Sequence, residues 1–138
     1  MKIQVAKMSG DIIEGYNHIV VSDNHINYMN ISDNECIEIL ANDVLDSFTD
    51  DKIQDCIVSL VSKLRLGGKL VIGGKDLRLF CKSVLNGLVS RGEASSVLQN
   101  TNSMPSLKEI TPIIERTGLK ILSTQLSGIH FEVVAQRG

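Results

Sequence analysis

The chain has 138 residues, of which 43% are hydrophobic, and a formal net charge of −2 at pH 7. This amount of apolar material suits one globular core, so we expect a single domain over residues 1–138. No basic stripe and no long apolar run is present, so the composition excludes the usual nucleic-acid binders and membrane-spanning helices. Residues 1–10 also lack the apolar stretch of a secretion signal.

The cysteines and histidines do not have the spacing of a metal site or a disulfide framework. The cysteines are odd in number, are far apart and include no C-x-x-C pair, and each has apolar neighbours. We therefore expect three small buried side chains, a reducing cytoplasmic location and no bound metal. The residues concerned are Cys36, Cys56, Cys81, His18, His25 and His130.

The first part of the chain predicts mainly strands. Short apolar runs predict strands over residues 2–6, 18–22 and 36–41, and residues 26–31 are either a weak further strand or a connection. Runs that are apolar at nearly every position are typical of parallel strands covered on both faces.

The middle of the chain alternates helix and strand. An apolar stripe at helical spacing predicts a helix over residues 53–64, ended by Gly67-Gly68. Residues 69–72 predict a strand and residues 77–90 a helix capped by Asp76. The polar stretch over residues 91–105 predicts a mobile loop.

The last part predicts a helix and a hairpin. Ser106 and Glu109 form a capping box for a helix over about 106–117, although Pro112 favours an alternative start with Thr111 as the cap. Residues 119–125 and 129–136 are strands joined by a turn so short that they must be antiparallel. The whole order predicts an α/β fold with a mostly parallel sheet and an antiparallel C-terminal hairpin.

Several segments resemble the class I S-adenosylmethionine-dependent methyltransferases. The stretch 36–48 is similar to the fourth strand of that family and the segment after it, and 64–72 is similar to its L-K-P-G-G-x-L-V-I segment. Thr117-Gly118-Leu119-Lys120 stands where the family shows A-G-F, and 14–21 resembles the opening of small methyltransferase-like proteins. The resemblance implies a three-layer Rossmann-like fold with helices reduced on one face.

The same resemblance implies a set of site residues. Asp23 takes the place of the acid that binds the cofactor's ribose, and Asp33 is placed near the adenine. Gly10 is the one glycine left where the family has a glycine-rich loop that lets the backbone approach the cofactor. Asn42 and Asp43 follow the fourth strand, where Asn42 would bind the cofactor and Asp43 would be the catalytic base or substrate contact.

Two functions remain open at this stage. One is a reduced S-adenosylmethionine-dependent methyltransferase that acts on a small molecule or a saccharide. The other is a methyltransferase fold that has lost catalysis and serves as a binding or structural subunit, because Ala6, Lys7 and Met8 replace the glycines of the loop. Shortened helices would leave one face of the sheet uncovered, and a homodimer is the simplest way to cover it.

Overall fold

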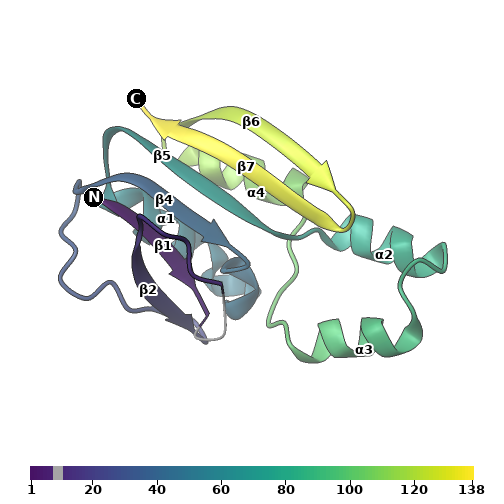
Figure 1. Cartoon of the computed structure of the whole chain (residues 1–138). Helices are drawn as coiled ribbons and strands as arrows, with labels where there is room; N and C mark the ends of the chain where they lie inside the picture. Colours follow the sequence, from purple (N-terminus) through teal and green to yellow (C-terminus); the bar gives the residue numbers. More distant parts are fainter. Residues whose placement is uncertain (8–10) are drawn as a thin grey trace.

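The computed structural model describes residues 1–7 and 11–138. Seven strands form one sheet in the order β3-β2-β1-β4-β5-β7-β6. The strands are β1 (Lys2–Ala6), β2 (Asn17–Ser22), β3 (His25–Ile26), β4 (Cys36–Asn42), β5 (Leu64–Lys75), β6 (Leu119–Ser127) and β7 (His130–Arg137). The helices are α1 (Ile53–Lys63), α2 (Leu77–Leu85), α3 (Arg91–Gln99) and α4 (Leu107–Arg116). Figure 1 shows the arrangement.

Parallel and antiparallel pairing follow the prediction. β1 pairs in parallel with β2 and β4, and β4 pairs in parallel with β5. β7 lies between β5 and β6 and is antiparallel to both. The predicted fold class, a mostly parallel sheet that ends in an antiparallel hairpin, is confirmed.

The core lies between the sheet and two helices on one face. Ile39 of β4 and Leu70 of β5 are fully buried, as are Leu60 of α1 and Ile110 of α4. Figure 1 shows α1 and α4 behind the sheet and no helix drawn across its front. Alternate side chains along these strands point to the two faces, so the buried set marks the face that the helices cover.

The opposite face has lost its helices in the part of the chain that the structure describes. Residues 11–16, which belong to the described part of the connection after β1, are not helical. They lie over this face instead, because Gln4 of β1 donates to the Asp11 carbonyl at 2.7 Å and accepts from the Ile13 N–H at 2.9 Å. A side-chain amide therefore anchors an irregular segment where a helix would otherwise cover the sheet.

The stretch left open between strand and connection is mostly connection, and the predicted stop of the first helix was wrong. Only Ile26 of residues 26–31 belongs to a strand, which it forms with His25 antiparallel to β2, because two turn residues cannot supply the crossover that a parallel strand needs. α1 ends at Lys63, before Gly67, because the next residue, Leu64, is extended and fully buried. Gly67 has a φ of +79° but lies inside β5.

The predicted loop contains α3. Its cap, Ser90, accepts from the Glu93 N–H at 3.2 Å and donates to the Glu93 carboxylate at 3.0 Å. α3 buries no residue, so its sequence has no apolar stripe from which a helix could be predicted. α2 is shorter than predicted and ends at Leu85, just before Asn86 and Gly87. For α4 the capping box at Ser106 is the correct start, and Pro112 lies inside the helix.

The cysteines differ from the prediction at one position. Cys36 and Cys56 are buried, whereas Cys81 on α2 is exposed. Burial raises the pKa of the Cys56 thiol to about 12 and also raises the pKa of Cys36, since a thiolate is poorly solvated in an apolar core.

We expect one fast-reacting thiol per folded chain. Because only the thiolate attacks a disulfide reagent, Cys81 should react with Ellman's reagent at pH 8 and the other two should react only after unfolding in guanidinium. Cys81→Ser should remove the fast reaction completely. A fast phase of more than one thiol per chain in the folded protein would contradict the buried positions of the other two.

Candidate functional site

The carboxyl ends of the parallel strands meet at one edge of the sheet. Open α/β sheets bind ligands at this edge. A cleft of about 440 Å³ lies there, and we call it the carboxyl-edge cleft. It is lined by Gln4, Val5, Ala6, Lys7, Asp11, Ile13, Leu40, Asn42, Asp43 and Lys75.

The cleft carries charges of both signs. Lys7 and Lys75 supply two ammonium groups, and Asp11 and Asp43 supply two carboxylates. Asn42 adds an amide that can both donate and accept hydrogen bonds. Such a lining can hold a ligand that itself has a cationic and an anionic group close together.

Asn42 and Asp43 occupy the middle of this edge, as predicted from the sequence. The Asp43 N–H donates to the Gly73 carbonyl at 2.9 Å, which ties the end of β4 to β5. Asp43 has a φ of 59°, a left-handed conformation that aspartate tolerates better than most residues. Both residues also line a second hollow of about 400 Å³ on the β7 side, together with His130 and Glu132.

The segment after β1 is tied to the segment after β4 by an ion pair. Lys7 Nζ lies 2.8 Å from Asp46 Oδ1, and Asp46 is only 8% exposed. Among the described residues no hydrogen-bond donor of good geometry reaches this oxygen, so the Lys7 ammonium compensates the buried charge. Sequence reasoning missed this pair, because it joins residues far apart in the chain.

Asp23 follows β2 and therefore lies at the same edge, but it does not line the carboxyl-edge cleft. Its carboxylate accepts a hydrogen bond from Asn102 Nδ2 at 3.1 Å. Asn102 also donates to the Ser47 carbonyl at 3.0 Å, so it links the turn after β2 to the segment after β4. The Asp23 carboxylate therefore bonds to Asn102 of the same chain and does not line the cleft.

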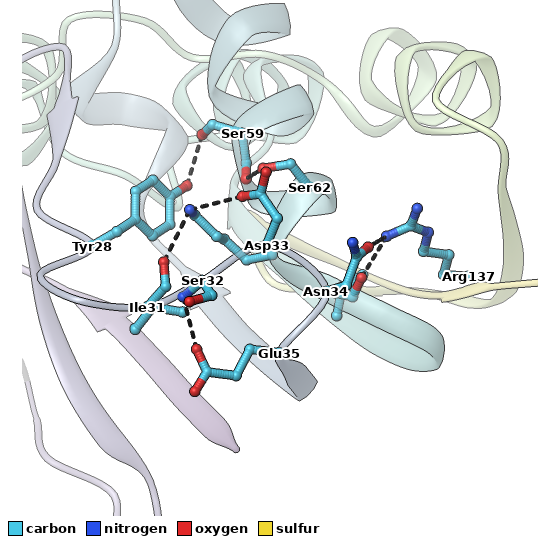
Figure 2. Close-up of polar contacts among 11 residues, drawn as sticks. Tyr28, Ile31, Ser32, Asp33, Asn34, Glu35, Ser59, Ser62 and Arg137 are labelled. Atoms are coloured by element: carbon cyan, nitrogen blue, oxygen red, sulfur yellow. Dashed lines mark hydrogen bonds and ion pairs between the residues drawn. The ribbon is translucent and has the colours of Figure 1, made fainter.

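Asp33 lies away from the cleft. It precedes β4 and so lies at the opposite end of that strand from Asn42. Its carboxylate is paired with Lys63 of α1, whose Nζ is 2.9 Å from Asp33 Oδ1 and 3.1 Å from the Ile31 carbonyl. Figure 2 labels Asp33 and Ile31 and marks both contacts with dashed lines. The structure does not bring Asp33 together with the other predicted site residues, because the connection before β4 runs along the amino edge of the sheet.

The neighbours of Asp33 form a structural cluster (Figure 2). Tyr28 Oη is 2.7 Å from Ser59 Oγ, and Ser59 gives its own hydrogen to the Cys56 carbonyl, so Tyr28 is the donor. Burial raises the pKa of Tyr28 well above its usual value, which keeps this donor protonated. Lys63 Nζ also lies 5.1 Å from the centre of the Tyr28 ring. These contacts fasten the 28–35 connection to α1.

Gly10, the remaining glycine of the predicted loop, lies outside the described residues. Lys75, which the sequence analysis did not select, lines the cleft at the end of β5. The rule that ligands bind at the carboxyl ends of parallel strands would have identified it. Within the described ranges no group of three or more potential metal ligands is gathered, and no helix is long and apolar enough to cross a bilayer.

Comparisons with known proteins agree with this architecture. No family model and no curated protein matches the sequence. Among solved structures, the chain is similar to an S-adenosylmethionine-dependent methyltransferase from Archaeoglobus fulgidus, with a TM-score of 0.65 and 10% identity over 99% of this chain and 85% of the other.

Two further solved structures support the same fold. A methyltransferase from Thermotoga maritima gives a TM-score of 0.61 and 14% identity over 99% of this chain and 82% of the other. An O-methyltransferase family protein from Burkholderia thailandensis gives a TM-score of 0.59 and 20% identity. That match covers 75% of this chain but only 31% of the other protein. The chain therefore has the fold of the S-adenosylmethionine-dependent methyltransferases.

Proposed function

We propose that the chain binds S-adenosylmethionine in the carboxyl-edge cleft and acts as a reduced methyltransferase on a small molecule or a saccharide. The observation that carries this proposal is the mixed charge of the cleft. The amino-acid end of the cofactor has a carboxylate, an ammonium and a neighbouring sulfonium, which match the lysines and the aspartates of the lining. The cleft volume of about 440 Å³ lies within the range of small-molecule sites.

The residues fit the amino-acid end of the cofactor better than its nucleoside end. Lys75 would hold the carboxylate, since Lys7 is paired with Asp46, and Asp11 or Asp43 would hold the cationic groups. No acid of the described part of the chain stands in the cleft at the ribose position, since Asp23 lies outside it. The remaining affinity would come from apolar contacts with residues such as Val5 and Leu40.

When bound, the cofactor supplies an electrophilic methyl group. Asp43 lines both the carboxyl-edge cleft and the second hollow, so it is the residue best placed to meet ligands in both. Its carboxylate would accept a hydrogen bond or a proton from the acceptor's hydroxyl or amine group. Asn42 shares this position and would orient the two ligands.

The proposal is tested by titration calorimetry with S-adenosylmethionine and S-adenosylhomocysteine. We expect binding to the unaltered chain, and a loss of about tenfold in affinity for Asp43→Asn or Asn42→Ala, because each change removes a hydrogen bond to a polar or charged group. Asn at position 43 retains the left-handed backbone, so the loss would reflect the charge. Asp33→Asn is the matched control and should bind as the unaltered chain does.

Two observations favour a second candidate, a fold that has lost catalysis and acts as a binding or structural subunit. The Lys7–Asp46 pair spans the edge where the family's glycine loop would be, and a degenerate loop would leave little room for the cofactor. The part of the sheet face opposite α1 and α4 that residues 11–16 leave open, with Val20 41% exposed, offers a surface for a second copy in the cytoplasm. Absence of binding heat at millimolar ligand by a folded chain would exclude the first proposal and support this one.

A further inference from the structure

A separate hollow of about 720 Å³ lies between α2, α4 and β6, and we call it the helix–strand hollow. It shares no lining residue with the carboxyl-edge cleft or with the second hollow. Leu79 of α2, Leu107 of α4 and Leu126 of β6 give it an apolar interior. Apolar walls of this extent are typical of small-molecule sites.

Three cationic side chains also line this hollow. Arg78 and Lys82 come from α2, and Lys108 comes from the first turn of α4. Within the described residues, none of the three takes part in an ion pair. Arg78 and Lys82 are four positions apart on one helix, a spacing at which like charges repel each other.

The nearby acid does not neutralise these cations. Asp76 also lines the hollow, but it is only 3% exposed, and its two oxygens accept from the Leu79 and Leu107 N–H groups at 3.1 and 2.8 Å. Its carboxylate therefore holds the first turns of α2 and α4 in place. The other lining residues are apolar, positively charged or, at Thr111 and Thr124, neutral and polar, so no second acid lines the hollow.

We propose that the helix–strand hollow binds a small anionic amphiphile. Its apolar body would displace water from the three leucines, and its carboxylate, sulfonate or phosphate head would bind the three cations. A volume of about 720 Å³ suits a single small molecule. The charge complementarity selects an acid over a neutral or cationic compound of the same length.

The test compares two ligands with the same alkyl chain. Calorimetry of the whole chain with dodecanoate and with dodecyltrimethylammonium, both below their micelle concentrations, separates head-group charge from apolar burial. We expect dodecanoate to bind at least about tenfold more tightly, and its affinity to fall as salt is added. Equal affinity for the two ligands would overturn the proposal.

Matched variants locate the binding. Leu126→Asp places a negative charge inside the hollow at a side chain that is 53% exposed, and it should weaken dodecanoate binding at least about tenfold. Leu122→Asp, on the same strand, 42% exposed and outside the hollow, is the control and should not change binding. Lys82→Gln should weaken binding about threefold, whereas Lys120→Gln should have no effect.

A lipid surface is the other source of the same chemistry. Vesicles containing phosphatidylglycerol should not carry the chain with them in a flotation experiment, since the ligand is expected to enter the hollow as a single molecule. Flotation with vesicles, together with no binding of monomeric dodecanoate, would overturn the proposal. A Leu126→Asp variant that is folded, by its circular dichroism spectrum, and still binds dodecanoate normally would also overturn it.

Discussion

Asp76→Ala should lower the free energy of unfolding by about 2–4 kcal/mol, because one buried carboxylate caps two helices. Asp76 is the N-cap of α2, where it accepts from the Leu79 N–H, and its other oxygen accepts from the Leu107 N–H at the start of α4. Alanine would leave the Leu79 and Leu107 N–H groups without their acceptor. Water could not easily replace it, since Asp76 is only 3% exposed. Unfolding in urea, followed by circular dichroism, measures the loss.

Two further variants test whether the bond from Asp76 to α4 adds to its N-cap bond in α2. Asp76→Asn retains one acceptor oxygen and should lose less than Asp76→Ala. Ser90→Ala removes the cap of α3, an exposed helix that buries no residue, and should cost less than about 1 kcal/mol. Equal losses for Asp76→Ala and Ser90→Ala would show that the link to α4 adds nothing.

Gly73→Ala should cost about 3 kcal/mol, whereas Gly74→Ala should be nearly neutral. A Cβ atom on Gly73 would lie 2.7 Å from the Phe131 carbonyl oxygen and 2.5 Å from Asn42 Oδ1. The first contact is with backbone of β7, which cannot move without breaking the antiparallel pairing, so the strain is that of an overpacked core. At Gly74 the nearest atom is Phe131 Cε1 at 3.8 Å, an ordinary contact.

Thermal unfolding of the two variants checks this difference. Gly73→Ala should also displace the Asn42 side chain, which lines the carboxyl-edge cleft, so any ligand held there by Asn42 should bind more weakly to this variant at a temperature where it is still folded. Gly74→Ala serves as the control for both readouts. A Gly73→Ala variant that is as stable as Gly74→Ala would contradict the close approach of β5 and β7 at Gly73.

Much of the fold could be predicted from local pattern. The β6–β7 hairpin follows from two strands joined by a turn too short for a crossover, and α1 follows from its apolar stripe. α3 was missed because it buries no residue, so its sequence carries no apolar stripe, and only Ser90 and Glu93 mark its start. The length of β5 was underestimated because its first part, from Leu64, contains two glycines, which are poor strand formers.

A site residue could be placed from the sequence only where it directly follows a predicted parallel strand, because that fixes the edge of the sheet at which it lies. Asn42 and Asp43 follow a parallel strand and therefore had to lie at its carboxyl edge. Asp33 was assigned by resemblance alone, and its place before the start of β4 puts it at the other edge. The Lys7–Asp46 and Asp23–Asn102 contacts depend on how loops fold back over that edge, which no local pattern encodes.

The strand order also has a consequence for the order of folding during synthesis. β7 is made after β6, yet it lies between β5 and β6 in the sheet. β6 is therefore translated before the strand that connects it to the rest of the sheet exists, and until then β5 has an unpaired edge. A nascent chain that pauses after β6 can pair β1, β2, β4 and β5. β6 can join this sheet only when residues up to Arg137, the end of β7, have left the ribosome.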